Sequence, residues 1–235
     1  MQEEEYLKRY LEPENLEEGL KRLHRGEPAQ YIVGNVDFYG YLLDVNPNVL
    51  IPRFETEELV SKTIGHLREF HHPRIVDIGT GSGCIAISLK KEIDCDMEAV
   101  DISKKALETA YHNATKNDAD IRFLEGSLLE PLLGEYDCII SNPPYISYDE
   151  EIMEVVSKNE PALALYAGEE GLACYDVILK TCKPYLKEKF LLAFEIGSSQ
   201  GKRLIEKAHR YLPKARAWVE KDMQGRDRFL FIRES

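Results

Sequence analysis

An Asn-Pro-Pro-Tyr turn directly follows the apolar run YDCIIS and combines an amide, two rigid residues and a phenol. Pro143 and Pro144 donate no backbone hydrogen bond, and the residue before a proline is held extended, so we expect Asn142 to be firmly placed where a strand ends. The side-chain oxygen of Asn142 and the carbonyl of Pro143 can then accept hydrogen bonds from one planar NH₂ group. Tyr145 supplies a flat aromatic wall.

This arrangement suits a nitrogen whose lone pair is delocalised, as in a carboxamide or in the exocyclic amine of a nucleic-acid base. Two acceptors draw on its hydrogens, favour a pyramidal nitrogen and direct the lone pair at an electrophile. Their effect grows as positive charge develops on nitrogen, so it acts in the transition state and no strong base is needed. An isolated Asn-Pro-Pro would only end a strand, but its position behind an apolar strand favours a functional turn.

The sequence DIGTGSG, which begins at Asp77, lies between an apolar strand and a helical pattern. Its three glycines, Gly79, Gly81 and Gly83, permit tight turns and close approach to a ligand, and their GxGxG spacing does not require a pyrophosphate. Asp101 ends the next strand and can accept both hydroxyls of a ribose, whereas Asp77 is expected to brace the loop through backbone N–H groups. A glycine loop alone could equally be structural, but its context together with Asp101 favours an adenosine-type ligand.

Both motifs require a framework, and strands alternate with helical patterns from residue 73 onward. Seven stretches are typical of strands: RIVDIG, DMEAVDIS, IRFLEG, YDCIIS, FLLAFEIG, ARAWVEKD and DRFLFIRES. The alternation predicts an α/β fold with a doubly wound, mostly parallel sheet, and the last two stretches predict an antiparallel edge. Because the carboxyl ends of neighbouring parallel strands meet, the glycine loop and the Asn-Pro-Pro-Tyr turn are expected to lie side by side.

The first part of the chain is organised differently. Residues 1–26 predict a short helical segment of one or two helices. Residues 27–72 predict a connector in GEPAQYIVG, a β-hairpin in VDFYGYLLDV and a linking helix in which Thr56 is a candidate N-cap. Residues 73–235 then form the larger α/β domain.

The charge distribution bears on the partner. The net charge of −12 argues against a general nucleic-acid binder. Residues 183–235 hold 13 Lys and Arg against 7 Asp and Glu, a net charge of +6, so the first 182 residues carry −18. The basic residues near 202–210 are expected to be the solvated face of an amphipathic helix, and the alternative is a docking surface for an anionic partner.

Other classes of protein and site are disfavoured. Apolar runs such as FLLAF are too short to cross a membrane, and MQEEEYLKRY is unlike a secretory signal, so we expect a cytoplasmic protein. The five cysteines are odd in number and form no CxxC pair, and the six histidines do not repeat at ligand spacing. We expect neither a disulfide framework nor a metal site.

Together these stretches resemble the release-factor glutamine N5-methyltransferases (the PrmC/HemK family), which are class I S-adenosylmethionine-dependent methyltransferases with a Rossmann-like sheet. The resemblance covers roughly residues 26–235 and rests on GEPAQYIVGNVDFYG, VLIPRFETEELV, VDIGTGSGCIAISL, AVDIS, SNPPYI, NEPALAL, GLACYDVI, FEIGSSQG and DMQGRDRFLFI. It implies transfer of a methyl group from S-adenosylmethionine, leaving S-adenosylhomocysteine. The acceptor would be the side-chain amide nitrogen of the glutamine in the Gly-Gly-Gln loop of class 1 peptide-chain release factors.

The resemblance also implies roles for individual residues. The glutamine would be received by Asn142, Pro143, Pro144 and Tyr145, which would also be the catalytic residues, with Arg53 as a further substrate contact. The cofactor would contact Asp77, Gly79, Thr80, Gly81, Ser82, Gly83, Asp101, Ile102, Ser127, Leu128 and Asn142. Arg53, Glu55 and Thr56 would lie near the mouth of the cofactor site, although helix capping and ion pairing at the start of the linking helix explain these three equally well.

The chain departs from the family pattern in two places. The Gly-Asp expected after the third strand reads EGSLLEP here, so Ser127 stands where an acid would meet the adenine amine, and Leu128 would cover the base. Adenine would then be held less tightly or by a backbone carbonyl. Members of the family also carry an N-terminal bundle of several helices that helps to dock the release factor, whereas about 25 residues precede GEPAQY here, enough for one or two helices.

Other functions fit parts of this pattern. Methylation of an adenine amine in DNA or RNA would use the same turn but needs a flipped base and a basic cleft. The charge of the first 182 residues argues against it, although the basic C-terminal segment leaves a nucleic-acid contact open. A glutamine of a ribosomal protein is another alternative acceptor. A non-catalytic cofactor-binding module is disfavoured by the intact turn, so we expect an enzyme that acts on release factors.

Overall fold

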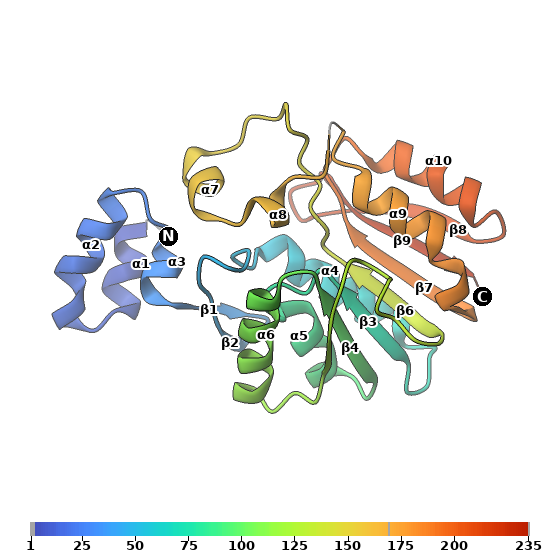
Figure 1. Cartoon of the computed structure of the whole chain (residues 1–235), viewed down its shortest axis with the longest axis horizontal. Helices are drawn as coiled ribbons and strands as arrows, with labels where there is room; N and C mark the ends of the chain where they lie inside the picture. Colours follow the sequence, from blue (N-terminus) through green and yellow to red (C-terminus); the bar gives the residue numbers. More distant parts are fainter. Residues whose placement is uncertain (1–2, 169, 235) are drawn as a thin grey trace.

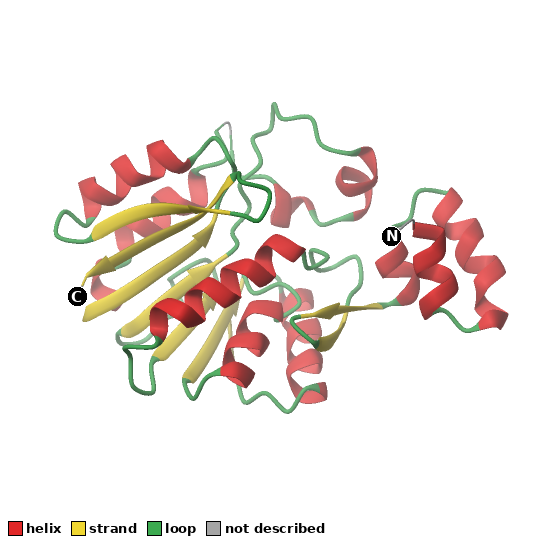
Figure 2. Cartoon of the chain, turned by 180° about the vertical axis from the view of Figure 1, so that it is seen from behind, coloured by secondary structure: helices red, strands yellow, loops and turns green. Residues whose placement is uncertain are grey.

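The computed structural model describes residues 3–168 and 170–234, in which a helical lobe at the N-terminal end is joined to a larger α/β body (Figures 1 and 2). The lobe contains α1 (Glu3–Tyr10), a 3₁₀ turn (Pro13–Asn15), α2 (Leu16–His24) and α3 (Ala29–Val33). It has a small apolar core of its own around the buried Leu7, Ala29 and Ile32. The predicted connector GEPAQYIVG is therefore partly helical, and α3 ends at Gly34, which adopts a left-handed conformation with φ of 84°.

The predicted β-hairpin is confirmed and links the lobe to the body. Strands β1 (Asn35–Phe38) and β2 (Tyr41–Asp44) are antiparallel. Both turn residues, Tyr39 and Gly40, have positive φ angles of 54° and 80°, which is the twist that a two-residue hairpin turn requires. The Tyr39 N–H also donates to Glu57 Oε1 at 3.0 Å, which supports this strained position.

The predicted mostly parallel, seven-stranded sheet is also confirmed. Its order is β5-β4-β3-β6-β7-β9-β8, and antiparallel pairing is confined to β7–β9 and β9–β8 at one edge. The strands are β3 (Arg74–Ile78), β4 (Asp96–Asp101), β5 (Arg122–Glu125), β6 (Tyr136–Ser141), β7 (Leu186–Glu195), β8 (Arg216–Lys221) and β9 (Asp227–Glu234). Strands β3 and β6 and the last six residues of β7 are almost wholly buried, as expected for a sheet that is covered on both faces.

Alternate residues of each strand enter two separate cores. Ile75 and Cys138 point to the side of α4 (Phe54–Leu67), α5 (Cys84–Glu92) and α6 (Lys104–Lys116). Val76 and Ile139, one residue further along, point to the side of α9 (Ala173–Thr181) and α10 (Gly201–Tyr211). This period of two makes the register of the sheet specific and fixes which strand ends meet at the site.

A segment between β6 and α9 was not predicted to be structured. It contains α7 (Glu154–Asn159) and α8 (Ala162–Leu165), and a parallel bridge pairs Ile146 with Tyr166. The segment lies between the lobe and the body (Figure 1), and Asn159 donates to the Gly26 carbonyl at 2.8 Å. It therefore connects the chain that leaves β6 with the N-terminal helices.

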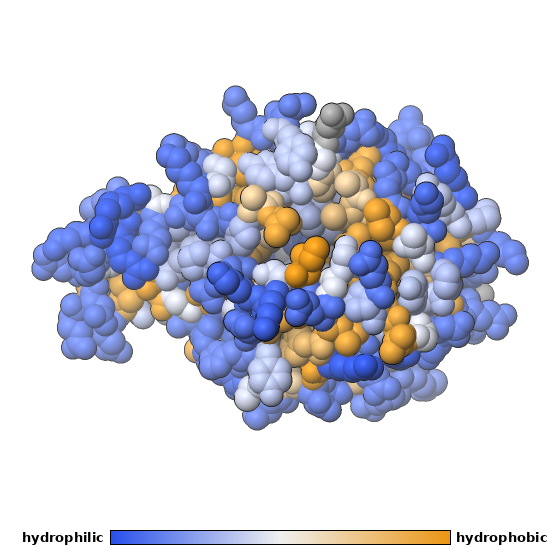
Figure 3. Space-filling model, in the orientation of Figure 1, coloured by the Kyte–Doolittle hydropathy of each residue, from blue (hydrophilic) through white to orange (hydrophobic). Residues whose placement is uncertain are grey.

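The surface of the molecule is mixed in polarity. Figure 3 shows apolar side chains gathered around a hollow near the centre of one face, bordered by hydrophilic residues. Within the described ranges, no helix is long and apolar enough to span a membrane, and no cluster of His, Cys, Asp and Glu has the composition of a metal site. Four of the cysteines are buried, namely Cys84, Cys95, Cys138 and Cys182.

Candidate functional site

The two predicted motifs lie at adjacent strand ends. In the parallel β3–β6 pair, Ile78 is in register with Ser141, so the glycine loop and the Asn-Pro-Pro-Tyr turn leave the same edge of the sheet. The Ser141 hydroxyl donates to the Ile78 carbonyl at 2.6 Å and joins these two ends directly. The expectation that the two motifs are neighbours is therefore correct.

The glycine loop is built around left-handed backbone conformations. Gly79, Gly81 and Gly83 have φ angles of 74°, 56° and 84°, which favour glycine. A Cβ atom on Gly79 or Gly81 would meet no protein atom within 4 Å, so these two border open space where a ligand can approach. A Cβ atom on Gly83 would lie 3.1 Å from Ile87 and 3.3 Å from Ala110, so this glycine allows close packing of helices.

Two carboxylates hold the loop. Asp77 is fully buried and accepts from the Thr80 hydroxyl at 2.6 Å, so a side-chain hydroxyl supplies the brace that was expected from backbone N–H groups. Burial raises the pKa of Asp77 to about 7, against the lowering effect of Thr80. Asp101 accepts from the N–H groups of Gly81 at 2.9 Å and Ser103 at 2.8 Å, and burial raises its pKa as well.

The other predicted cofactor residues follow the ends of β4 and β5. Ile102 follows Asp101 and is 60% exposed, which is unusual for an isoleucine. Ser127 and Leu128 follow β5, and Leu128 has a φ of 49° that is uncommon for this residue type. The Gly126 N–H donates to the Asp101 carbonyl at 3.1 Å, so the ends of β4 and β5 are joined beside the glycine loop.

The Asn-Pro-Pro-Tyr turn is held by residues from two distant elements. Asn142 donates through Nδ2 to Thr56 Oγ1 at 3.1 Å, and Thr56 donates in turn to Glu195 Oε2 at 2.7 Å. The Tyr145 hydroxyl donates to the other oxygen, Glu195 Oε1, at 3.3 Å. Both ends of the turn therefore converge on one carboxylate at the end of β7.

The prediction of Thr56 as a helix N-cap is wrong. The N-cap of α4 is Arg53, with no side-chain cap, and Thr56 lies inside the first turn of the helix. Its side chain is buried, and its hydroxyl is used in the contact between Glu195 and Asn142. A long-range partner has taken the hydroxyl that a local cap would have used.

Glu195 and Gln200 are site residues that reasoning from the sequence missed. Glu195 is only 2% exposed, and burial raises its pKa to about 7. Gln200 donates through Nε2 to the Tyr145 carbonyl at 2.9 Å and to the Gly171 carbonyl at 3.2 Å. The available signal for Glu195 was an acid at the end of the apolar strand FLLAFE, because a charge there must find partners.

The backbone of the turn also packs closely against Gly171. Gly171 has a φ of 65°, and a Cβ atom there would lie 2.1 Å from the Tyr145 carbonyl oxygen. Only glycine fits so close to the turn. Burial, followed by the charge of Glu195, raises the pKa of the Tyr145 phenol well above its usual value, so this phenol stays protonated.

Arg53 and Glu55 form ion pairs near the start of α4. Arg53 Nη2 donates to Glu160 Oε1 at 2.5 Å, and the buried Glu160 also accepts from the Ile51 N–H at 3.1 Å. Glu55 pairs with Arg226 at 2.9 Å. The sequence offered helix capping and ion pairing as explanations of this stretch that need no ligand. Ion pairing is observed, whereas α4, all of whose residues the structure describes, has no side-chain cap.

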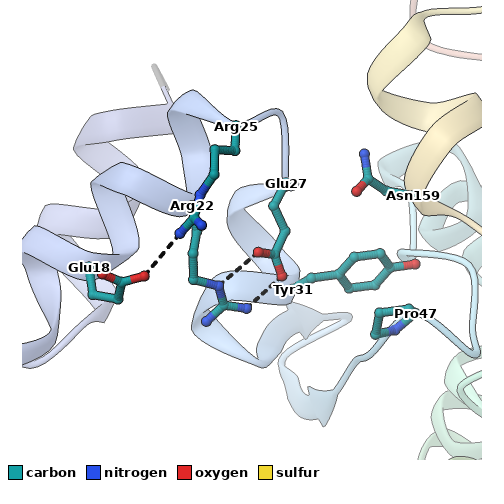
Figure 4. Close-up of a pocket in the computed structure, with 7 residues that line it drawn as sticks. All are labelled: Glu18, Arg22, Arg25, Glu27, Tyr31, Pro47 and Asn159. Atoms are coloured by element: carbon teal, nitrogen blue, oxygen red, sulfur yellow. Dashed lines mark hydrogen bonds and ion pairs between the residues drawn. The ribbon is translucent and has the colours of Figure 1, made fainter.

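A separate cavity of about 490 Å³ lies between the N-terminal lobe and the α7 segment (Figure 4). It is lined by Glu18, Arg22, Arg25, Glu27, Tyr31, Pro47 and Asn159. Arg22 pairs with Glu27 at 2.5 Å and Arg25 with Glu18 at 3.0 Å, so its charges are matched in pairs. None of the residues that line this cavity belongs to the glycine loop or to the turn.

Comparison with known proteins identifies the relatives of this chain. Residues 55–160 match the family model of the methyltransferase small domain. Over 221 residues the chain is 40% identical to the release factor glutamine methyltransferase of Lactococcus lactis subsp. lactis (strain IL1403), covering 93% of this chain and 82% of that protein.

Solved structures agree with this relationship. The chain is similar to the release factor-specific protein-(glutamine-N5) methyltransferase of Alicyclobacillus acidocaldarius, with a TM-score of 0.50 and 25% identity over 82% of this chain and 99% of that chain. The 16S rRNA N2 G1207 methyltransferase of T. thermophilus, solved with AdoMet and guanosine, shares the fold with a TM-score of 0.62 and 13% identity, over 86% of this chain and 50% of that chain.

Proposed function

Since the chain belongs to the release factor glutamine methyltransferase family, we propose that it methylates the side-chain amide nitrogen of the glutamine in the Gly-Gly-Gln loop of a class 1 peptide-chain release factor. The observation that carries this proposal is the hydrogen bond from Asn142 Nδ2 to Thr56. It leaves the amide oxygen of Asn142 as the end available to a substrate. An acceptor at this position fits the NH₂ group of a glutamine.

The turn residues act on the glutamine amide by position and polarity. The Asn142 oxygen and the Pro143 carbonyl accept the two N–H groups, which draws electron density toward nitrogen and turns its lone pair outward. The ring of Tyr145 limits where the amide plane can lie. Because nitrogen gains positive charge as it forms its new bond, these two acceptors stabilise the transition state more than the ground state.

The residues near the glycine loop fit S-adenosylmethionine, the cofactor type of methyltransferases. When bound, it supplies an electrophilic methyl group on a sulfonium. The open space at Gly79 and Gly81 would admit its amino-acid portion, with Thr80, Ser82, Gly83 and Asp77 shaping the loop, and Asp101 has lone pairs left for ribose hydroxyls. The exposed Ile102 and the half-buried Leu128 would cover the adenine, with Ser127 beside its amine.

We further propose a division of roles along the chain. Residues 1–26 dock the release factor, residues 27–72 connect this segment to the α/β domain, and residues 73–235 carry out the methyl transfer. The cavity between the lobe and α7 supports this division, because a partner seated there would contact the segment that continues from the turn. Arg53 would act on the substrate indirectly, since its pairing with Glu160 holds this segment in place.

The proposal is tested by incubating the chain with methyl-labelled S-adenosylmethionine and a release factor. We expect one methyl group on the loop glutamine, located by mass spectrometry of the peptide. A release factor with that glutamine replaced by alanine is the control and should remain unlabelled. Equal labelling of the two factors would reject the glutamine assignment, and labelling only of RNA or of a ribosomal protein would reject the release factor as substrate.

A further inference from the structure

We propose that Glu195 is the positioning residue of the Asn-Pro-Pro-Tyr turn, because through the Thr56 hydroxyl it fixes which end of the Asn142 amide faces the substrate. This inference rests on the proposed function, since it concerns the acceptor for the substrate amide. The contacts Glu195–Thr56 at 2.7 Å, Thr56–Asn142 at 3.1 Å and Glu195–Tyr145 at 3.3 Å carry it. One buried carboxylate thereby holds both ends of the turn.

The direction of these hydrogen bonds follows from the charge of Glu195. An ionised carboxylate only accepts, so the single proton of the Thr56 hydroxyl is directed at Glu195. The Thr56 oxygen then offers only lone pairs to Asn142, and the NH₂ end of the amide bonds there. The Asn142 oxygen accepts no hydrogen bond from residues 3–168 or 170–234, so it is ready to receive the substrate.

A neutral residue at position 195 would reverse this chain of hydrogen bonds. A protonated carboxyl, or a glutamine, can donate to Thr56 and so releases the Thr56 proton toward Asn142. The Asn142 amide can then rotate by half a turn and present its NH₂ group to the substrate NH₂ group. Two donors facing each other lose the hydrogen bond on which the reaction depends.

The surroundings of Glu195 bring this reversal close to neutral pH. Burial raises its pKa to about 7, with Thr56 and Arg228 acting in the opposite direction. The ionisable groups that face it come from α4, α5, α9, β9 and the turn, and they are Glu55, Cys84, Tyr175, Arg228 and Tyr145. Arg228 favours the carboxylate and Glu55 disfavours it. Because the pKa of Glu195 is about 7, the ionised form predominates on the alkaline side of neutrality.

The first test compares Thr56→Val with Thr63→Val in the full chain acting on a release factor. Both changes remove a buried hydroxyl from α4, but Thr63 Oγ1 has no hydrogen-bond partner in the described part of the chain, so Thr63→Val is a matched control. Thr56→Val is expected to lower kcat about tenfold relative to this control. Its cofactor Kd should change by less than about twofold, and Thr56→Ser should recover most of the lost rate. Equal kcat values for Thr56→Val and Thr63→Val would overturn the proposal.

The second test is the pH dependence of kcat. The ionised form of Glu195 is the active one, so kcat of the parent is expected to rise as pH passes through about 7. Glu195→Gln is neutral at every pH and should have a low kcat without this rise. Asp77, whose pKa is also about 7, is unchanged in this variant. A rise of the same size in Glu195→Gln would therefore overturn the role of Glu195.

A third measurement separates this inference from the proposed function. In nuclear magnetic resonance spectra, the side-chain amide signals of Asn142 are identified by their loss in Asn142→Ala. They are expected to shift with pH near 7 in the parent and to stay constant in Glu195→Gln. An inactive parent with titrating Asn142 signals would reject the release-factor substrate but support the positioning role. Signals that do not titrate would overturn the positioning role whatever the activity.

Discussion

The two halves of the site are built in different ways. The glycine loop is local, because Asp77 holds Thr80 three residues away, and its more distant support is Asp101, 20 residues from Gly81. The Asn-Pro-Pro-Tyr turn depends on partners that are 86, 50 and 55 residues away in the contacts Asn142–Thr56, Tyr145–Glu195 and Tyr145–Gln200. One half is mainly shaped backbone, and the other is a set of converging side chains.

Mutations in the two halves should therefore have different effects. A change in the backbone of the glycine loop, which borders open space, should weaken cofactor binding. Damage to side chains that orient one acceptor should slow the reaction while the cofactor still binds. The cofactor Kd and kcat, measured separately, therefore distinguish damage to one half from damage to the other.

The largest effect is expected for Asn142→Ala. Removing the side-chain acceptor should lower kcat about a hundredfold to a thousandfold, comparable to the loss of one preorganised hydrogen bond in a transition state. Calorimetric titration with S-adenosylhomocysteine should give a Kd within about threefold of the parent, because Asn142 is only one of the expected cofactor contacts and the glycine loop is untouched. A Kd that rises as much as kcat falls would show that the two halves are not separable.

The next largest effects are expected when one glycine of each half, Gly171 beside the turn and Gly81 in the glycine loop, is replaced by alanine. Gly171→Ala places a Cβ atom 2.1 Å from the Tyr145 carbonyl in a left-handed conformation, so we expect a loss of about 3 kcal/mol in the free energy of unfolding, together with lower kcat. Gly81→Ala meets no protein atom, so only conformational strain of about 1–2 kcal/mol is expected, together with weaker cofactor binding. Denaturant unfolding measures both, and equal losses would contradict the comparison.

The smallest effect is expected for Asp101→Asn. The amide has a single oxygen, so it keeps an acceptor for only one of the N–H groups of Gly81 and Ser103, and it loses the charge. The cofactor Kd should therefore rise about tenfold. The fall in kcat at saturating cofactor should be smaller than this change. Calorimetry and initial rates give the two values, and a fall in kcat alone would place Asp101 with the turn instead.

The sequence predicted the half of the site that is local. Glycines between a strand and a helix, an acid at the next strand end and two prolines after a strand are patterns that neighbouring residues create by themselves. The central strands β3, β6 and β7 were predicted for the same reason, because their apolar stretches indicate burial. The helices α7 and α8 were not predicted, since six and four residues carry too little periodicity to be recognised.

The long-range supports could not be predicted in the same way. Thr56 has the type and place of a capping residue, and nothing within α4 indicates that β7 will approach it with a carboxylate. Glu195 and Gln200 acquire their roles only when β7 lies beside β6 and the chain returns behind the turn. Such contacts depend on the tertiary fold, so no short stretch of sequence contains them.

The pairing of Arg53 with Glu160 has a consequence for the response to ionic strength. Glu160 has a side chain that is only 2% exposed, whereas a pair such as Lys21–Glu17 in the lobe is 60% and 85% exposed. Dissolved ions screen exposed pairs strongly and buried ones weakly. High salt should therefore destabilise the helices of the N-terminal lobe, whereas the segment between β6 and α9, which Glu160 ties to Arg53, should keep its position.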